Sequence, residues 1–427
     1  MKVRNVLVFP AGTEIGLEIF HALKSCKEIN LFGAGQDISN HAKFLYAQYY
    51  SLPSIHEENW LDALTNLCET LQIDYIFPAY DDVIVALSKA KDSLPATVIC
   101  PSEKVCEITR SKSKTYMYLQ DVVKVPRLYA SPQEVMQYPV FIKPDQGQGS
   151  IGAKKITSKE ELLSSLSELP DAIISEFLPG EEYTIDCFSD REKGLLFSGA
   201  RIRGRMRNGI AVNTQTVDLP EADQIAKKIG ERLSLHGAWF FQMKRSSDGS
   251  LTLLEVAPRI AGSMATHRVI GVNFPLLCIY EHERFPVHIR TNEGAVELDR
   301  ALSNRYKHSI KFNVLYVDLD DTLILNQRVN EEVVRLIYQC INDRKKIVLI
   351  TRHALDLHKT LVSHRLAGLF DEIIHLSKTE KKSSYINESN AIFVDDSFSE
   401  RLDVANVCGI PTFDISMIEL ITKGSNE

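Results

Sequence analysis

The sequence lacks both the cysteine spacing of a zinc site and any long apolar run. Its eight cysteines form no Cys-x-x-Cys pair, and none stands at zinc-finger spacing with a histidine. We interpret them as small buried residues of a protein in a reducing compartment. A run of about 18 apolar residues, as a transmembrane helix needs, is absent. The N-terminal apolar stretch ends at Pro10, too short for a signal peptide. We therefore expect a cytoplasmic protein with no membrane partner.

An excess of positive charge is also missing. The 427 residues carry 49 Lys and Arg against 56 Asp and Glu, a formal net charge of −7. A protein whose main partner is nucleic acid usually has the opposite sign, so we expect no nucleic-acid partner. The composition, 44% hydrophobic and 25% charged, is that of soluble globular proteins, and the length suggests about three domains.

The first hundred residues alternate strand-like and helix-like pieces, which predicts a parallel α/β sheet. Gly12 and Gly16 follow the first strand, but the Gly-x-Gly-x-x-Gly spacing of a dinucleotide-binding loop is absent there. We interpret these two glycines as serving a tight turn and close helix packing. The apolar or amphipathic stretches are 3–9, 14–23, 29–32, 75–78 and 97–100.

The sequence pattern of the rest of the chain changes twice, at about residue 103 and at about residue 312. Short strands, glycine turns and isolated charges dominate from about 103 to 300, and the polar, irregular stretch 286–310 is typical of a linker. Residues 312–427 return to alternating strands and helices. We expect an α/β and α+β multidomain protein divided as 1–102, 103–300, a linker at 301–311, and 312–427.

A glycine-rich loop follows a buried strand that carries Lys143. The loop, Gly147 to Gly152, has the spacing Gly-x-Gly-x-x-Gly, and residues 153–156 after it are strand-like rather than helical. We predict a hairpin whose backbone N–H groups can close over phosphates. A protein kinase also uses such a flap, but its lysine follows the loop and a kinase catalytic loop is missing here. Read alone, the segment also fits an ordinary glycine hairpin.

Further pieces follow the hairpin in a characteristic order. They are a strand end and turn at 176–184, a strand with Gln242, a strand that ends in Glu255, and Arg259. Together they resemble the ATP-grasp superfamily, to which D-alanine–D-alanine ligase, biotin carboxylase and the large subunit of carbamoyl-phosphate synthase belong. The resemblance covers residues 1 to about 300. It implies a preceding α/β domain, an ATP-grasp fold, ATP and Mg²⁺ (or Mn²⁺) as cofactors, and a homodimer.

The resemblance assigns roles residue by residue. Gln242 and Glu255 match the Mg²⁺ ligands, and their oxygens are the donors that this ion prefers. Arg259 matches the arginine beside the transferred phosphoryl group, which a guanidinium can bind bidentately. The positions that match ATP-binding residues are Lys114, Lys143, Gly147, Gly149, Ser150, Gly152, Glu176, Phe177, Leu178 and Glu182.

One position departs from the family pattern. The family motif usually reads Glu-x-Asn-Pro-Arg, with the asparagine completing the metal shell. This chain has Glu255-Val256-Ala257-Pro258-Arg259 instead, and the side chain of Ala257 cannot coordinate a metal. The departure puts ligase turnover in doubt without removing ATP binding.

Arginines recur at every second position from Arg201 to Arg207. On one strand their side chains would share a face. A solvated basic edge that discourages strand pairing is the alternative interpretation. We expect Arg201 and Arg203 to face a substrate carboxylate or acyl phosphate, and Arg268 to be a further substrate residue. For His267, beside it, a hydrogen-bonded structural role is the better interpretation.

A second constellation lies near residue 318. An apolar strand ends in Asp318-Leu-Asp320-Asp-Thr, and acids crowded at a strand end repel one another unless a cation or a proton offsets them. The next strand ends in Thr351, lysines follow at 378, 381 and 382, and a third strand ends in Asp395-Asp396. This order resembles the haloacid dehalogenase-like phosphatase superfamily over residues 311–427. It implies a Rossmann-like domain.

The resemblance implies the following chemistry. Asp318 is the nucleophile that becomes an aspartyl phosphate, and Asp320 is the general acid and then the base. Thr351 hydrogen-bonds the phosphoryl oxygens, and Lys382, with Lys378 as the alternative, steadies the nucleophile. The stretches between the motifs are too short for a cap, so we expect a capless domain. The implied Mg²⁺ site comprises Asp318, Asp320, Asp395 and Asp396, with Asp396 preferred over Asp395 as the ligand.

Three functions compete at this point. The first is a bifunctional enzyme, an ATP-dependent carboxylate–amine ligase fused to a phosphatase. Its partners would be a small-molecule carboxylate, an amine or similar nucleophile, and a phosphorylated substrate. The alternative is a phosphatase with a non-catalytic, regulatory ATP-binding module, which Ala257 favours. The third is a ligase whose C-terminal domain is a scaffold, and the intact acidic motifs argue against it.

Overall fold

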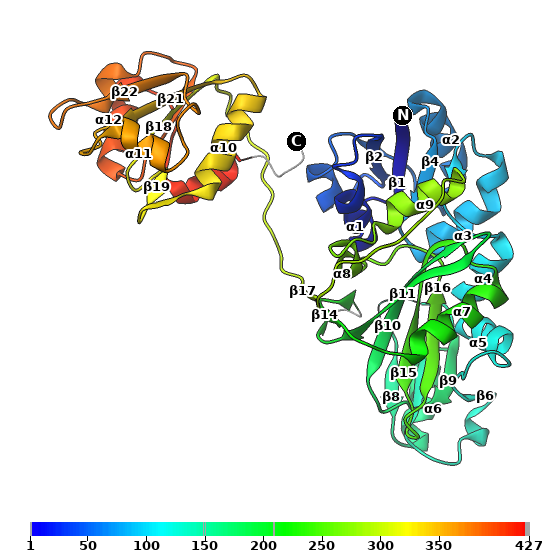
Figure 1. Cartoon of the computed structure of the whole chain (residues 1–427). Coiled ribbons are helices and arrows are strands. Elements are labelled where there is room, and N and C mark those ends of the chain that lie inside the picture. Colours follow the sequence, from blue (N-terminus) through cyan, green and yellow to red (C-terminus); the bar gives the residue numbers. More distant parts are fainter. Residues whose placement is uncertain (1, 148, 150, 208–209, 423–427) are drawn as a thin grey trace. The chain divides into compact units, whose positions relative to one another are not determined.

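The computed structural model describes residues 2–147, 149, 151–207 and 210–422. They form two compact units, Met1–Leu302 and Ser303–Glu427, each with its own sheets and core (Figure 1). None of the helices in this described part of the chain has the length and apolarity that a membrane crossing needs.

The N-terminal part of the first unit is the predicted parallel sheet with flanking helices. Its strand order is β3-β2-β1-β4-β5, and the central strand β1 buries Val6, Leu7 and Val8 completely. Such continuous burial is typical of a parallel sheet covered on both faces. The elements are β1 (Arg4–Phe9), α1 (Glu14–Leu23), β2 (Ile29–Gly35), η1 (His41–Phe44), β3 (Tyr49–Ser51), α2 (Trp60–Leu71), β4 (Tyr75–Pro78), α3 (Asp81–Ala90), η2 (Lys91–Ser93) and β5 (Thr97–Val98).

Helix α1 begins where the sequence predicts it. The Thr13 side chain accepts a hydrogen bond from the Gly16 N–H at 3.0 Å and caps the helix. A Cβ atom at Gly16 would lie 2.3 Å from the Ala11 carbonyl oxygen, so a larger residue would push the helix away from the turn. The interpretation of Gly16 as a close-packing glycine is confirmed.

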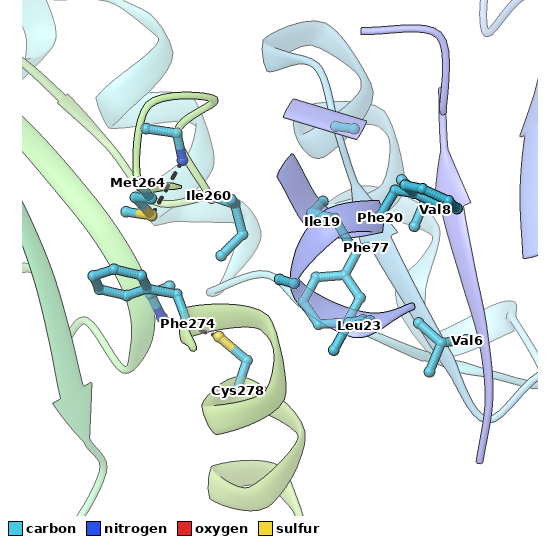
Figure 2. Packing of buried hydrophobic residues seen from close by; sticks show 14 of the residues in the cluster. Val6, Val8, Ile19, Phe20, Leu23, Phe77, Ile260, Met264, Phe274 and Cys278 are labelled. Carbon is cyan, nitrogen blue, oxygen red and sulfur yellow. Dashed lines mark hydrogen bonds between the residues drawn. The ribbon is translucent and has the colours of Figure 1, made fainter. Parts of the chain in front are cut away.

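One core cluster joins this sheet to a segment far along the chain. Residues of β1 and α1 pack against the stretch that follows residue 259, which includes α8 (Ala265–Arg268) and α9 (Phe274–His282). The packing fixes the position of the loop that carries Arg259. Figure 2 labels Val6, Val8, Ile19, Phe20, Leu23, Phe77, Ile260, Met264, Phe274 and Cys278 in this cluster.

A small sheet of order β6-β9-β7-β8 carries the predicted glycine hairpin. Strands β7 and β8 pair antiparallel, with Val140 opposite Ile156, so the strand–loop–strand prediction is confirmed. Two helices, α4 and α5, lead from the first sheet into this one. The elements are α4 (Glu103–Arg110), α5 (Lys112–Leu119), β6 (Leu128–Tyr129), η3 (Pro132–Glu134), β7 (Val140–Pro144), β8 (Lys154–Ile156), α6 (Lys159–Glu168) and β9 (Ala172–Glu176).

A larger antiparallel sheet has the order β16-β15-β10-β11-β14-β17. Alternate residues of β15 face the core: Trp239 and Phe241 are fully buried, whereas Gln242 between Phe241 and Met243 is only half-buried. The other face is therefore available for a site. The elements are β10 (Glu182–Asp190), β11 (Gly194–Arg203), β12 (Met206–Arg207), β13 (Ile210–Ala211), β14 (Asn213–Thr216), α7 (Glu221–Leu233), β15 (Gly237–Arg245), β16 (Leu251–Ala257) and β17 (Glu297–Asp299).

Two sequence predictions are wrong in this sheet. The four arginines do not share one strand face, because β11 ends at Arg203 and Arg207 lies in the separate β12–β13 hairpin. The chain turns at Gly204, where a Cβ atom would lie 2.3 Å from the Asn213 side-chain oxygen. The stretch 286–310 is also not all linker, because β17 within it pairs with β14 as an edge strand.

The second unit is a parallel sheet of order β22-β21-β18-β23-β24 with helices on its faces. Its strands are nearly continuous apolar runs, and all four residues of β18 and of β23 are buried. The elements are β18 (Val314–Val317), β19 (Ile324–Leu325), β20 (Arg328–Val329), α10 (Glu331–Asn342), β21 (Lys346–Thr351), α11 (Leu357–Ser363), β22 (Glu372–His375), η4 (Lys382–Tyr385), β23 (Ala391–Val394), α12 (Phe398–Cys408), β24 (Thr412–Phe413) and η5 (Ile415–Leu420).

Replacing Ile19 with alanine should lower the free energy of unfolding of the first unit by about 2–5 kcal/mol. The Ile19 side chain is fully buried in the shared core, so the variant leaves a cavity. Urea unfolding followed by tryptophan fluorescence measures this unit alone, because both tryptophans, Trp60 and Trp239, lie in it. Ile38→Ala is the matched control, since Ile38 is 59% exposed. Equal losses in the two variants would contradict the packing described.

Candidate active sites

Four side chains stand in one row across the large antiparallel sheet. Strand pairing sets Arg201 of β11 opposite Thr184 of β10. Thr184 in turn lies opposite Gln242 of β15, which lies opposite Glu255 of β16. Directly opposed residues of antiparallel strands project to the same face. All four line one pocket, which we call the basic pocket after its arginines, Arg110, Arg201, Arg203, Arg259 and Arg300.

A second pocket lies beside the glycine hairpin, and we call it the hairpin pocket. Its lining includes Phe141 and Lys143 of β7 and Gly147 and Gly149 of the loop. The two pockets meet at the row, because residues lining both include Lys112, Gly147, Gly149, Arg203, Gln242 and Glu255. A molecule in the hairpin pocket and one in the basic pocket would therefore come together over Gln242 and Glu255.

Two further positions of the glycine loop, Gly152 and Ser150, were predicted to bind ATP. Gly152 has φ of +73°, a conformation that favours glycine, and a Cβ atom there would lie 3.1 Å from Pro144. The sequence predicts that Ser150 contacts phosphate, but this residue lies outside the described part of the chain.

Lys143 is buried at the floor of the hairpin pocket. Its Nζ donates to the Tyr116 hydroxyl at 2.7 Å, and that hydroxyl donates to the Leu254 carbonyl oxygen at 2.7 Å. Burial, together with the nearby Lys112 ammonium, lowers the pKa of Lys143 to about 8. The side chain is thus a cation that is poorly compensated by the protein and suited to an anionic ligand.

Lys112 occupies the place that the sequence analysis gives to Lys114. Its Nζ donates to the carbonyl oxygens of Pro144 and Gly147 at 3.2 and 3.3 Å, and it lines both pockets. Lys114, two residues further along α5, is exposed. The difference follows from the helix start: Ser111 caps α5, so Lys112 is its first residue and lies beside the loop after β7. Burial lowers the pKa of Lys112 as well.

Three residues at and after the end of strand β9 also line the hairpin pocket. They are Glu176, Phe177 and Leu178. The Lys155 Nζ lies 4.5 Å from the centroid of the Phe177 ring, a cation–π contact that holds the ring at the pocket. The carboxylate of Glu182 lies in the same pocket and is paired with the Arg203 guanidinium.

Gln242 and Glu255 offer two side-chain oxygens where the pockets meet. The Gln242 Oε1 atom accepts a hydrogen bond from Arg203 Nη1 at 2.9 Å, which orients the amide. Oxygen donors of this kind fit Mg²⁺. Ala257, two residues beyond Glu255, is buried at the basic pocket and adds no oxygen ligand. The donor set at this position is one carboxylate and one amide.

Two of the arginines expected to contact phosphate or substrate, Arg259 and Arg268, are held by carboxylates. Arg259 Nε lies 2.5 Å from Asp81 Oδ1, and its guanidinium lies over the Phe240 ring at 5.2 Å. Burial works against its charge, but Asp81 outweighs burial and the pKa of Arg259 is raised. Arg268 instead reaches helix α1, where it pairs with Glu18 at 2.6 Å. The structure thus shows Arg268 in an ion pair with helix α1, and the predicted substrate contact stays a prediction.

Arg201 is fixed by a buried acid. Its Nε and Nη2 atoms lie 2.9 and 3.1 Å from the two carboxylate oxygens of Asp186, which is fully buried. His267 Nδ1 lies 2.9 Å from the same carboxylate. The predicted hydrogen-bonded structural role of His267 is confirmed, and the pair with Asp186 orients the Arg201 guanidinium in the wall of the basic pocket.

The second unit brings its acids together at the carboxyl ends of neighbouring strands. Asp318 follows β18, and Asp395 follows β23, which pairs with β18. The Nζ atom of Lys382 lies 2.6 Å from Asp318 Oδ1 and 2.6 Å from Asp395 Oδ2, and all three side chains are buried. Burial raises the pKa of Asp318 to about 7, although Lys382 opposes this shift. Lys378, the alternative lysine, is exposed.

Asp396 completes a group that could hold a metal ion. The ligand atoms of Asp318, Asp395 and Asp396 all lie within 4.8 Å of one another. The Thr322 hydroxyl lies 3.2 Å from Asp396 Oδ1 and accepts from the Asp396 N–H at 3.0 Å, which fixes this residue. Three carboxylates at one point are the hard oxygen donors that suit Mg²⁺.

Asp320 lies apart from that group. His353 Nδ1 is 2.8 Å from Asp320 Oδ1, and His353 Nε2 is 2.9 Å from the Thr360 hydroxyl. The Asp320 side chain is therefore directed to His353 and not to the other acids, which departs from its prediction as a metal ligand. Thr351 is buried at the end of β21, where its hydroxyl oxygen accepts from the His353 N–H at 3.1 Å.

Sequence reasoning missed three residues at these sites. Lys112 could have been found from Ser111, the polar cap that starts the helix. His353 stands two residues after Thr351, so its place at a strand end was a usable signal. Arg401 has no such signal: it lies in α12, and its Nη1 atom donates to the carbonyl oxygens of Asp395 and Asp396 at 2.6 Å.

Two family models match the first unit. The model described as "ATP-grasp in the biosynthetic pathway with Ter operon" matches residues 168–295, which include the row from Arg201 to Glu255. The model described as "PylC-like, N-terminal domain" matches residues 6–100, the parallel sheet and its helices.

A curated relative matches part of the same unit. The D-alanine–D-alanine ligase of Fusobacterium nucleatum subsp. nucleatum is 28% identical over 165 residues, which cover 35% of this chain and 56% of the relative. The chain thus spans little more than half the length of this relative.

Two solved structures share the fold of the first unit. The biotin carboxylase domain of Hydrogenobacter thermophilus 2-oxoglutarate carboxylase, a dimer in complex with MgADP, ADP and bicarbonate, has a TM-score of 0.57 at 18% identity. The match covers 70% of this chain and 74% of that chain. The L-amino acid ligase from Bacillus licheniformis has a TM-score of 0.56 at 17% identity, with coverages of 67% and 76%. The first unit of this chain thus shares the fold of these two enzymes, and its residues 168–295 match a family model of ATP-grasp proteins.

Proposed function

We propose that the protein is a bifunctional enzyme, an ATP- and Mg²⁺-dependent carboxylate–amine ligase joined to a Mg²⁺-dependent phosphatase. The row from Arg201 to Glu255 carries the ligase half of the proposal, because it joins the hairpin pocket to the basic pocket. The similarity to a D-alanine–D-alanine ligase and to an L-amino acid ligase supports an amine as the second substrate.

ATP fits the chemistry of the hairpin pocket. Phe177 and Leu178 supply apolar surface for the base, and the Glu182 carboxylate can accept hydrogen bonds from ribose hydroxyls. Lys143 and Lys112 supply positive charge for the phosphates, and the glycine loop allows backbone N–H groups to approach them. ADP bound to Mg²⁺ in the similar biotin carboxylase domain supports this placement.

The oxygen donors described above would hold Mg²⁺, or Mn²⁺, in both units. Gln242 and Glu255 would bind the ion in the first unit, and the cluster around Asp318 in the second. A bound ion would neutralise charge on phosphate oxygens.

The proposed ligase reaction has two steps. A carboxylate oxygen of the acid attacks the γ-phosphorus of ATP, the bond to ADP breaks, and an acyl phosphate forms. The amine nitrogen then attacks the acyl carbon, inorganic phosphate leaves, and the nitrogen loses a proton. Arg259, fixed by Asp81, and Arg203, fixed by Glu182, would stabilise the charge on the transferring group. The rest of the catalysis is positioning.

The proposed phosphatase reaction uses the second unit. The Asp318 carboxylate attacks the phosphorus of a phosphoester and becomes an aspartyl phosphate. Asp320, oriented by His353, gives a proton to the leaving oxygen and then takes one from the attacking water. The Thr351 oxygen already accepts a backbone hydrogen bond, so its O–H is available to a phosphoryl oxygen. Lys382 neutralises charge beside the nucleophile.

Ala257 favours a second candidate function. With one carboxylate and one amide at the meeting point of the pockets, the first unit has fewer oxygen ligands than the family pattern supplies. In this alternative the unit binds ATP without turning it over and regulates the phosphatase. We further propose a cytoplasmic location, which would keep the eight free cysteines reduced, and a homodimer like that of the similar biotin carboxylase domain.

The ligase proposal is tested by ADP release from the Asp318→Asn protein with Mg²⁺-ATP and pooled amino, hydroxy and sugar acids. The substitution removes the phosphatase nucleophile, so ADP comes from the ATP-grasp site. We expect acid-dependent ADP release, and a loss of at least about 100-fold when Glu255→Gln is added. Tight ATP binding without ADP release from any pool would instead support the regulatory module.

Nucleotide affinity should fall as the pH rises above 8. Lys143 binds phosphate as an ammonium, and its pKa is lowered to about 8. Affinity is therefore full below this value, and about tenfold weaker one pH unit above it. Calorimetric titration with ADP at fixed Mg²⁺ from pH 7 to 9.5 measures the slope. Lys143→Met should bind more weakly with a flat profile, and exposed Lys159→Met should keep the wild-type slope. A wild-type slope in Lys143→Met would assign the titration to another group.

Two lysines four residues apart, Lys378 before η4 and Lys382 at its start, should differ sharply in the phosphatase reaction. Lys382→Met removes the cation between Asp318 and Asp395, and we expect hydrolysis of p-nitrophenyl phosphate with Mg²⁺ to fall at least about 100-fold. Lys378→Met, which removes an exposed lysine four residues earlier, should change the rate less than about twofold. Circular dichroism checks that both variants are folded. Similar rates in the two variants would refute the role given to Lys382.

A further inference from the structure

Arg300 is an arginine of the basic pocket that has no role in the reaction above. Arg300 directly follows β17, the edge strand of the large sheet, and its N–H donates to the Val212 carbonyl oxygen at 2.7 Å. The side chain lines the basic pocket and is partly buried. Among the described residues, its guanidinium has no hydrogen-bond or ion-pair partner.

The other arginines of this pocket are all paired. Arg201 is bonded to Asp186, Arg259 to Asp81 and Arg110 to Asp82. Arg203 is bonded to Glu182. A guanidinium that is removed from water without a partner loses hydration that nothing replaces, so it is costly unless a ligand pairs with it.

The neighbours of Arg300 compensate its charge only in part, because Glu18 and Glu14 act on it without pairing with it. Burial lowers its pKa, and repulsion by Arg201 lowers it further. Glu18, one of the two acids close enough to act on it, is already paired with Arg268 at 2.6 Å. The other, Glu14, is an exposed residue of the same pocket and forms no ion pair with Arg300. Two guanidinium groups near each other at one pocket wall are a site for an anion.

The Arg300 side chain lies close to Gly262. A Cβ atom at Gly262 would lie 3.2 Å from Arg300 Nη2 and 3.1 Å from the Glu14 Cβ. The guanidinium thus lies against the loop that follows Arg259, at the end of the pocket next to helix α1.

This anion site is separate from the reaction centre. Arg201 and Glu255 occupy the two ends of the row, three strand spacings apart. Adjacent strands are about 4.8 Å apart, so about 14 Å separates the two backbones. The Arg201 guanidinium is held on Asp186, whereas Arg203 of the same strand reaches Gln242. We therefore treat an acid group between Arg201 and Arg300 as distinct from the group that reacts over Glu255 and Gln242.

We propose that Arg300, together with Arg201, binds a second acidic group of the carboxylate substrate. The substrate is then a dianion, activated at one carboxylate over Glu255 and anchored through a distal carboxylate or phosphate by the two arginines. The inference rests on the proposed ligase function for the reacting end. The anchoring end follows from the unpaired guanidinium.

We call Arg300 and Arg201 the anchor. Its binding of a distal acidic group is tested first in the absence of turnover. Full-length protein with ADP and Mg²⁺ is treated with phenylglyoxal, and the modification of each arginine is followed by mass spectrometry. We expect Arg300 to react faster than Arg201, which Asp186 holds. Succinate, glutarate or adipate should slow the reaction at Arg300 at least about fivefold, and butanoate, pentanoate or hexanoate should not. Equal protection by the diacids and the monoacids, or none by any acid, would overturn the proposal.

The source of the acidic group is distinguished in the same assay. The probe 4-phosphonobutanoate carries a phosphonate where glutarate carries its second carboxylate. Stronger protection by the phosphonate indicates a phosphorylated substrate, and stronger protection by glutarate indicates a dicarboxylate. Either result supports the anchor.

Kinetics then separate the anchor from the reaction centre. In the ADP-release assay with the best diacid, Arg300→Gln should raise KM roughly 10- to 100-fold with little change in kcat. The control Arg205→Gln removes an exposed arginine paired with Asp299 and should leave both constants unchanged. Unchanged KM in Arg300→Gln overturns the anchor. Absence of ADP release from wild-type protein, with Arg300 still protected, would count against the ligase reaction only.

Discussion

Strand register is the constraint on which the candidate site of the first unit depends. Successive residues of a strand face opposite sides, so a slip of one position would turn Gln242 and Glu255 into the core. The register of β15 is fixed by Trp239, Phe241 and Met243, whose side chains are buried on the other face. A bulge after Gln242 changes its pairing with β16, from Gln242 opposite Glu255 to Met243 opposite Leu253. The apolar face of the strand thus places the polar row, and the two pockets meet where that row lies.

In the second unit, parallel strands position the side chains of the candidate site. β18 lies between β21 and β23, and the residues that follow these strands converge at one edge, as ligand sites do in open α/β sheets. This convergence buries Asp318 and Asp395 together, an arrangement that repulsion would oppose. Lys382 lies between them and compensates part of the charge. The remaining negative charge is what makes the position suitable for a cation and a phosphoester.

The sequence predicted what depends on local pattern. The alternation of strands and helices gave the parallel sheets, and the strand after the glycine loop gave the hairpin instead of a helix. Contacts between distant segments could not be predicted. The pairing of Arg268 with Glu18 joins residues 250 positions apart, and no local signal distinguishes it from a substrate contact. The resemblance assigned the phosphate contact to Lys114, whereas Lys112 of the same short polar segment lines the pockets, and only the start of α5 decides between them.

The charge around Ala257 argues for turnover rather than simple nucleotide sensing. Replacing the usual asparagine removes one neutral oxygen, but the carboxylate of Glu255 stays in place. Cationic side chains gather around the same point, with Lys112, Arg203 and Lys244 in the hairpin pocket and Arg259 in the basic pocket. A unit that binds ATP without turning it over needs cationic side chains only along the phosphates of the nucleotide. Arg259 is beyond the hairpin pocket, held by a carboxylate and a ring, where it would contact a group that has left the nucleotide. A half-buried ion pair at that place would orient Arg259 toward a transferred phosphoryl group.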